Sequence, residues 1–158
     1  MLEYGGAVDQ AIAALLHDVV EDGHATDDEI RTGFGPTVAR IVAGCTDTAA
    51  RSGQPREPWY ERKTGYAARI RTESETIHFV SAADKLHNAR AILRDYRRQG
   101  EDVFAHFKAD KGSTIWYYPA LIGALRISDT DRDLVDELAR TIRNLIALTY
   151  PADTTQLP

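Results

Sequence analysis

Cysteine is almost absent from this sequence, and long apolar runs are missing altogether. The single cysteine, Cys45, has no partner for an intramolecular disulfide, and the chain shows no signal-peptide pattern. We therefore expect a protein of the reducing cytoplasm. Because no apolar stretch approaches the roughly 18 residues that a membrane span needs, we expect no membrane as partner.

Positive charge is also in short supply. The 158 residues contain 19 Lys and Arg against 24 Asp and Glu, for a net charge of −5. Nucleic-acid polymers are bound through clustered Lys and Arg, so we expect no such partner, and any phosphate ligand must be held locally. The composition suits one globular domain, which we expect over residues 1–150, with a flexible tail over residues 151–158.

Strand patterns are lacking as well. No run of alternating β-branched residues is long enough for a strand, whereas apolar residues recur at helical spacing almost throughout. The sequence therefore predicts an all-α fold, a helical bundle. We expect helices over residues 7–20, a short one from 26, one from 36 to about 44, then 59–71, 75–99, 114–126 and 131–148. The polar stretch at residues 46–58 predicts a mobile surface loop.

Two polar pairs lie four residues apart at the end of the first predicted helix. On a helix His17 and Glu21 share one face, as do Asp18 and Asp22. Imidazole and carboxylate together suit Mn²⁺, Fe²⁺, Zn²⁺ or Mg²⁺, and the absence of thiolates argues against a closed structural zinc site. A solvated acidic helix end with a structural histidine is the alternative explanation.

A carboxylate also interrupts the apolar side of the long helix at residues 75–99. Asp84 follows two alanines, and Asn88 lies one turn further on. A buried charge needs a partner. Lys85 points about 100° away around the helix, so we expect it to be a poor partner. A metal ion shared with His17 and Asp18 would meet the need.

Together these segments resemble the hydrolase domain of the RelA/SpoT proteins and the small alarmone hydrolases of the HD superfamily. The resemblance rests on Ala-Leu-Leu-His-Asp-Val-Val-Glu-Asp at 14–22, Phe34-Gly35, Thr46, Ala-Asp-Lys-Leu-His-Asn at 83–88 and, less strongly, Trp116-Tyr117-Tyr118. The combination is specific, although no single piece is. It implies an HD-domain helical bundle, a bound Mn²⁺ and removal of the 3′-pyrophosphate from the alarmones ppGpp and pppGpp.

Carried over position by position, the resemblance also implies roles for single residues. The metal ligands would be His17, Asp18 and Asp84. The attacking water would be handled by Glu21 and Asp22, and Asn88 would help to hold the nucleotide. These roles suit the chemistry, because a divalent ion lowers the pKa of its bound water and a nearby carboxylate can accept the proton.

Basic side chains are needed near the leaving pyrophosphate, and Arg62, Lys63 and Arg90 are the candidates. Lys63 ranks first, because Glu-Arg-Lys at 61–63 resembles the corresponding stretch of small family members. For Arg62 and Lys63, a solvated helix face is the alternative.

The start of the chain departs from the family pattern. Family members carry a further metal-binding histidine and a basic nucleotide-binding motif upstream, whereas no histidine precedes His17 here. We therefore expect an N-terminally shortened domain whose three-ligand site holds Mn²⁺ weakly. The first helix would expose apolar surface, which could join copies into a homo-oligomer. Among the other histidines, His24 is the first replacement ligand to test.

The sequence leaves three functions open. The first is an alarmone hydrolase, and the second is an HD phosphohydrolase that acts on another nucleotide. The third is a non-catalytic nucleotide-binding or interaction module, which the missing histidine favours. In each case the partner is a small phosphorylated nucleotide. Bound metal together with hydrolysis of a nucleotide would exclude the non-catalytic module.

Overall fold

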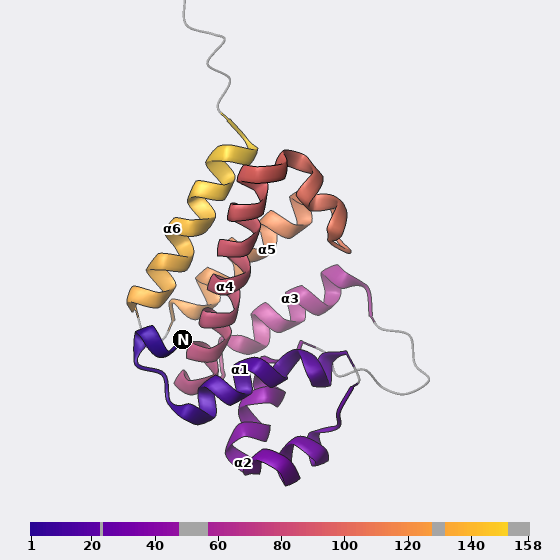
Figure 1. Ribbon diagram of the computed structural model, residues 1–158, viewed down its shortest axis with the longest axis vertical. Helices are drawn as coiled ribbons and strands as arrows, with labels where there is room; N and C mark the ends of the chain where they lie inside the picture. The colour runs from indigo at the N-terminus through magenta and orange to yellow at the C-terminus, as the bar shows by residue number, and fades with distance from the viewer. Residues whose placement is uncertain (23, 48–56, 128–131, 152–158) are drawn as a thin grey trace, which may run out of the picture.

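The protein is described by a computed structural model over residues 1–22, 24–47, 57–127 and 132–151. The elements in chain order are η1 (Leu2–Tyr4), α1 (Val8–Glu21), α2 (Asp27–Cys45), α3 (Trp59–Ile70), α4 (Glu75–Gln99), η2 (Gly100–His106), α5 (Lys111–Leu125) and α6 (Arg132–Thr149). The described residues form helices and no strands (Figure 1), which confirms the predicted all-α fold.

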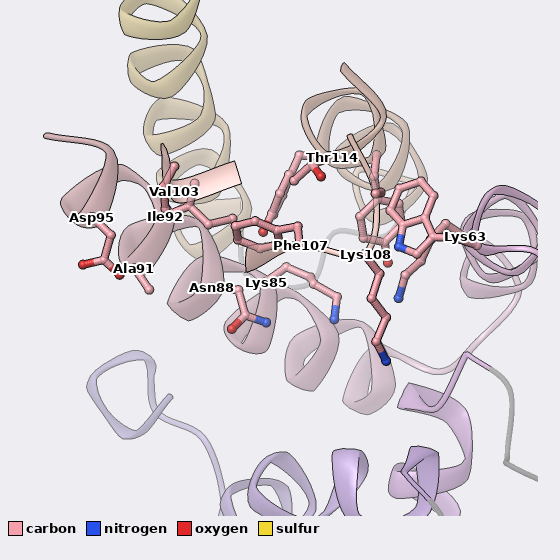
Figure 2. Close-up of a pocket in the computed structure, with 14 residues that line it drawn as sticks. Lys63, Lys85, Asn88, Ala91, Ile92, Asp95, Val103, Phe107, Lys108 and Thr114 are labelled. Atoms are coloured by element: carbon pink, nitrogen blue, oxygen red, sulfur yellow. The ribbon is translucent and has the colours of Figure 1, made fainter. Parts of the chain in front are cut away.

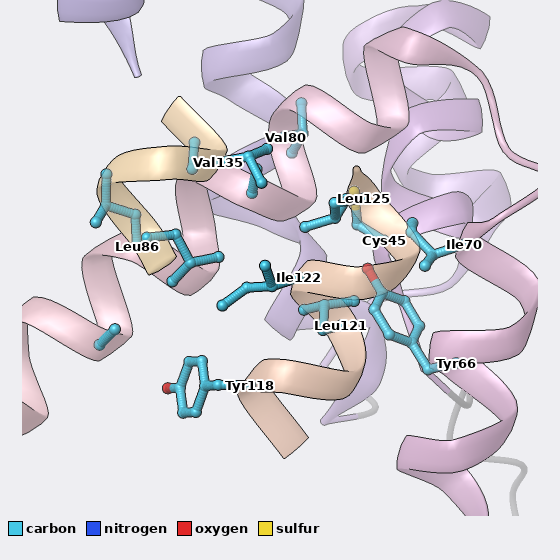
Figure 3. Close-up of a cluster of buried hydrophobic side chains, with 14 of the residues drawn as sticks. Cys45, Tyr66, Ile70, Val80, Leu86, Tyr118, Leu121, Ile122, Leu125 and Val135 are labelled. Atoms are coloured by element: carbon cyan, nitrogen blue, oxygen red, sulfur yellow. The ribbon is translucent and has the colours of Figure 1, made fainter. Parts of the chain in front are cut away.

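The long helix α4 is the centre of the bundle. It packs against α1, α2, α5, α6 and η2, while α3 packs on α5. In Figure 1, α6 runs alongside α4 and the α1–α2 pair lies across its lower end. The buried side chains of the core cluster come from α1 to α6 and η2, and those labelled in Figure 3 include Cys45, Ile70, Val80, Leu121, Leu125 and Val135.

Local capping signals place several helix ends where the sequence predicts them. At the start of α2 the Glu29 amide donates to Thr26 Oγ1 at 3.2 Å, and the Thr26 amide donates to the Glu29 carboxylate at 2.8 Å. This is the predicted capping box. The two helices expected around Gly35 meet there in one kinked element, because Gly35 has a φ of 87° that interrupts the helical backbone.

Other boundaries differ from the prediction. The helix η2 was not predicted, and α5 begins at Lys111 rather than at residue 114. It starts earlier because the Asp110 carboxylate caps it, accepting a hydrogen bond from the Ser113 amide at 2.9 Å. Pro119 lies inside α5, which continues helical across it.

The apolar face of α1 is only partly buried. Ile12 and Leu16 pack against the core, but Val8 is 70% exposed and Leu15 is 80% exposed. This agrees with the expectation that the first helix exposes apolar surface. The reason is geometric, because α1 packs mainly against α2 and α4, which leaves its remaining side without a neighbour among the described residues.

Some predictions fall outside the described residues. They are the centre of the predicted loop, residues 48–56, and the predicted tail from residue 152 onward. The single domain over residues 1–150 stays a prediction. Within the described part of the chain, no helix is both long and apolar enough to cross a membrane.

Gly44 allows α2 and α4 to approach closely, which gives a test of the fold. A Cβ at this position would lie 2.5 Å from Cδ1 of Ile77, which is buried. Gly44→Ala should therefore destabilise the protein by about 1–3 kcal/mol, the usual cost of overpacking a core. The matched control is Gly65→Ala in α3, where an added Cβ meets nothing within 4 Å.

The control should be neutral or stabilising by up to about 1 kcal/mol, because alanine favours a helix more than glycine does. Urea unfolding of both variants measures the difference. Equal stabilities would contradict a close contact between α2 and α4.

Candidate metal centre and adjoining pocket

The three predicted metal ligands come together where α1 packs on α4. His17 and Asp18 belong to α1, and Asp84 belongs to α4. The His17 Nε2 atom lies 3.1 Å from Asp18 Oδ1 and 3.5 Å from Asp84 Oδ2. The side chains of His17 and Asp84 are largely buried, whereas that of Asp18 is 70% exposed. The packing of the bundle thus joins two motifs that are far apart in the sequence.

The backbone orients the His17 ring. Its Nδ1 atom lies 2.9 Å from the Ala14 carbonyl oxygen and donates to it, which directs Nε2 toward the two carboxylates. Burial alone would lower the pKa of His17, but hydrogen bonding and attraction from Asp18 and Asp84 outweigh it and raise the pKa to about 10. The carboxylates of Asp18 and Asp84 thus favour the protonated form of the imidazole.

Asp84 has two further partners on its own helix. The Lys85 ammonium pairs with Oδ2, and the Asn88 side-chain amide donates to Oδ1 at 3.0 Å. The expectation that Lys85 is a poor partner is wrong, because its long flexible side chain folds back although its Cβ points elsewhere. Burial would raise the pKa of Asp84, but Lys85 and His17 hold it well below its usual range.

The fit of these residues to a metal ion rests on their donor chemistry. Within the described ranges, no three carboxylate, histidine or cysteine side chains are already arranged to coordinate an ion. Instead, the His17 proton and the Lys85 ammonium balance the charge of the acids. The donors still suit a divalent ion, since an imidazole nitrogen anchored by a backbone carbonyl and two carboxylates are common ligands. Metal binding by His17, Asp18 and Asp84 stays a prediction.

The two predicted catalytic acids end α1 beside a second charged cluster. Glu21 Oε1 lies 3.6 Å from Arg62 NH1, and Arg62 NH1 lies 2.5 Å from Asp47 Oδ2. Lys63 Nζ donates to the same Asp47 oxygen at 2.7 Å. Burial raises the pKa of Glu21, and the negative charge of Asp47 raises it further. Asp22 caps the end of α1 and is exposed.

A cavity of about 380 Å³ adjoins the metal candidates. Lys63, Lys85 and Asn88 belong to its lining, and the remaining wall is mainly apolar and aromatic, with Trp59, Ile92, Val103, Phe107, Tyr117 and Tyr118. Figure 2 shows the ammonium groups of Lys63, Lys85 and Lys108 gathered on one side of this pocket. It can therefore receive an anionic group next to an apolar ring.

Two buried hydroxyl groups also line the pocket. The side-chain oxygens of Thr114 and Tyr117 have no hydrogen-bond partner among the described residues. A buried polar group without a partner costs free energy, so a ligand or water that reaches these oxygens gains from pairing with them. Neither hydroxyl stands out in the sequence as a site group, because Thr114 lies in an ordinary apolar helix and Tyr117 contributes only to the family resemblance.

Several other candidates lie elsewhere or have structural partners. Arg90 donates to Glu3 at 3.1 Å and lies 3.4 Å from Glu137, so it ties η1 to α6 instead of facing the pocket. Arg62 is buried against Asp47, which excludes a solvated helix face for this residue. The candidate replacement ligand His24 is exposed in the turn after α1, where its backbone amide donates to the Val19 carbonyl oxygen at 2.9 Å.

Comparison with known proteins agrees with this arrangement. The family model for the HD domain matches residues 1–115. The chain belongs to the HD domain family. A solved structure, that of lmo0812 from Listeria monocytogenes, is similar over 90% of this chain and 91% of its own, with a TM-score of 0.75 and 27% identity. The HD-type bundle expected from the sequence is therefore confirmed.

Curated relatives carry the name of one activity. This chain is 42% identical over 82 residues to guanosine-3′,5′-bis(diphosphate) 3′-pyrophosphohydrolase MESH1 of Danio rerio, which covers 52% of this chain. It is 39% identical over 82 residues to the protein of the same name from Homo sapiens. The chain spans 42% of the length of each of these two relatives. Their sequences support the predicted resemblance to alarmone hydrolases.

The burial of Asp84 predicts how the two acidic candidates differ. Asp84→Asn leaves Lys85 and His17 buried with too little negative charge, so it should destabilise the fold by about 3–5 kcal/mol. Asp18→Asn, at an exposed position, should change stability by less than about 1 kcal/mol. Urea unfolding in the presence of EDTA separates this effect from metal binding. A larger loss of stability for Asp18→Asn than for Asp84→Asn would contradict the buried contacts of Asp84 with His17 and Lys85.

Proposed function

We propose that this chain hydrolyses a phosphate or pyrophosphate ester of a nucleotide, with guanosine 3′,5′-bis(diphosphate) as the first substrate to test. One observation carries the proposal. Asn88 bonds the candidate metal ligand Asp84 and also lines the pocket with Lys63 and Lys85, so metal donors and phosphate-binding cations meet at one place. The names of the curated relatives support this choice of substrate.

Phosphohydrolases of the HD family depend on a divalent metal ion, and we propose Mn²⁺ for this chain. The residues that would hold it are His17, Asp18 and Asp84. When bound, the ion would lower the pKa of a coordinated water and offset the charge of the phosphoryl oxygens.

The protein's own groups supply the remaining steps. Glu21, whose pKa is raised, can accept the proton of the attacking water, and Asp22 is the second candidate for this role. Lys63 offers a cation to the leaving pyrophosphate, and Asn88 offers hydrogen bonds to the nucleotide. The apolar and aromatic wall suits the base or sugar, and the hydroxyl of Tyr117 can pair with a polar group of either.

Two alternatives keep the same pocket. Another nucleotide could be the substrate, because an HD fold does not define specificity. A binding module without turnover is the other, and it is favoured by the absence of a ready coordination sphere among the described residues. We do not propose a nucleic-acid polymer as partner. The exposed Val8 and Leu15 keep a homo-oligomer among the proposals. We also propose a cytoplasmic location, in keeping with a nucleotide substrate.

Pyrophosphate release from guanosine 3′,5′-bis(diphosphate) tests the function directly. We expect release that requires Mn²⁺ and stops on addition of EDTA, because in this proposal the metal ion activates the attacking water. Bound metal is measured in the same samples, and Asp136→Asn on the far ion pair with Arg126 is the control that should retain full activity. Nucleotide binding without release under any divalent ion would favour the binding module.

Glu21→Gln distinguishes a base from a ligand. Because Glu21 acts on water in this proposal, the variant should keep its bound metal while turnover falls by about 10²–10⁴-fold. Asp18→Asn is the matched comparison, since this exposed candidate ligand should lose metal and turnover together while the fold stays stable. Metal content is followed by elemental analysis and turnover by pyrophosphate release. Loss of metal in Glu21→Gln would reassign this residue as a ligand.

A further inference from the structure

Asp47 lies between the candidate base and the pocket, although nothing in the sequence marks it. It follows the end of α2 directly, yet only 3% of its side chain is exposed. Its Oδ2 atom accepts from Arg62 NH1 at 2.5 Å and from Lys63 Nζ at 2.7 Å. One carboxylate oxygen therefore holds two cations that are neighbours on α3.

Each of these cations leads to a different part of the site. Arg62 NH1 lies 3.6 Å from Glu21 Oε1, and the Arg62 side chain is buried. Lys63 lines the pocket, with its Nζ atom 5.3 Å from the centre of the Tyr117 ring. The chain of contacts runs from Glu21 through Arg62 and Asp47 to Lys63.

We propose that Asp47 is a positioning residue that holds Glu21, through Arg62, and Lys63 in the geometry that the reaction uses. This inference rests on the proposed hydrolytic function of the same site. Asp47 is not among the described residues that line the pocket, so we place it beside the reacting groups without contact to the nucleotide. Besides Arg62 and Lys63, it also interacts directly with Glu21.

Charge balance explains why this role belongs to Asp47. The cluster contains two acids, Glu21 and Asp47, and two cations, Arg62 and Lys63, so it is neutral as a whole. Without Asp47, Arg62 would keep Glu21 as its carboxylate neighbour among the described residues, and a full ion pair there would make Glu21 a weaker base. Lys63 would lose the bond that fixes its flexible side chain over Tyr117. Loss of Asp47 would therefore affect both the candidate base Glu21 and the pocket cation Lys63.

Asp47→Asn tests the inference, because asparagine keeps the shape of the side chain and removes its charge. We expect kcat to fall by about ten-fold or more and KM to rise. Removing a charged contact from a buried cluster typically changes a rate or an affinity by a factor of about ten or more. Asp47→Glu restores the charge and should recover part of both losses. Thermal unfolding shows whether either variant is folded at the assay temperature.

The pH profile of kcat gives a readout that a purely structural role would not change. Glu21 is faced by Asp47, which raises its pKa, and by Lys63 and Lys85, which lower it, while Arg62 lies close by. Removing the charge of Asp47 lowers the pKa of Glu21. The base then stays deprotonated to lower pH, so the acidic limb of the profile should move to lower pH in Asp47→Asn and return in Asp47→Glu.

A double-mutant cycle tests the link to Lys63. Affinity for guanosine 3′,5′-bis(diphosphate) is measured in EDTA, so that no turnover occurs, for Asp47→Asn, Lys63→Met and the double variant. Because both changes act through one ammonium group, Asp47→Asn should weaken binding much less in the Lys63→Met background. Asp136→Asn, which removes an exposed ion pair with Arg126, is the control that should leave affinity and kinetics unchanged.

The outcomes separate the two proposals. Additive effects in the cycle, together with an unmoved acidic limb, would overturn the positioning role of Asp47 even if the protein is an active hydrolase. Conversely, a chain that hydrolyses no nucleotide with any divalent ion refutes the proposed function. In that case, non-additive losses of affinity would still support the link between Asp47 and Lys63.

Discussion

Burying the carboxylate of Asp84 in the central helix costs free energy unless cations and donors surround it. His17, Lys85 and Asn88 provide them. His17 reaches Asp84 only because α1 packs on α4, and Asn88 and Lys85 carry the same contacts to the pocket wall. Because buried Asp84 needs these partners, helix packing, the candidate metal ligands and the candidate nucleotide pocket depend on one another.

A second neutral cluster lies next to the first and depends on a different pair of elements. Asp47 follows α2, while its partners Arg62 and Lys63 belong to α3. The position of α2 depends in turn on Gly44, whose missing side chain makes room for Ile77 of α4. A small residue at a helix contact thus helps to define where a charged group meets the site.

The sequence predicted what local signals encode. Apolar periodicity and the Thr26 cap located most helices, and the family resemblance selected His17 and Asp84. Asp47 was missed because its partners lie 15 and 16 residues away and meet it only in the folded chain. Lys85 was misjudged because the direction of its Cβ does not limit where the end of a long side chain can reach.

The pairing of Lys85 with Asp84 also bears on the order in which the protein is assembled. In small zinc-dependent domains the unfolded chain gathers its ligands only as the ion arrives, so folding waits for metal. Here an internal ammonium group already occupies the place of counter-ion, and the helices can form around it. An ion that binds as we propose would exchange onto a finished scaffold, and the supply in the surrounding cell would select it as much as the ligands do.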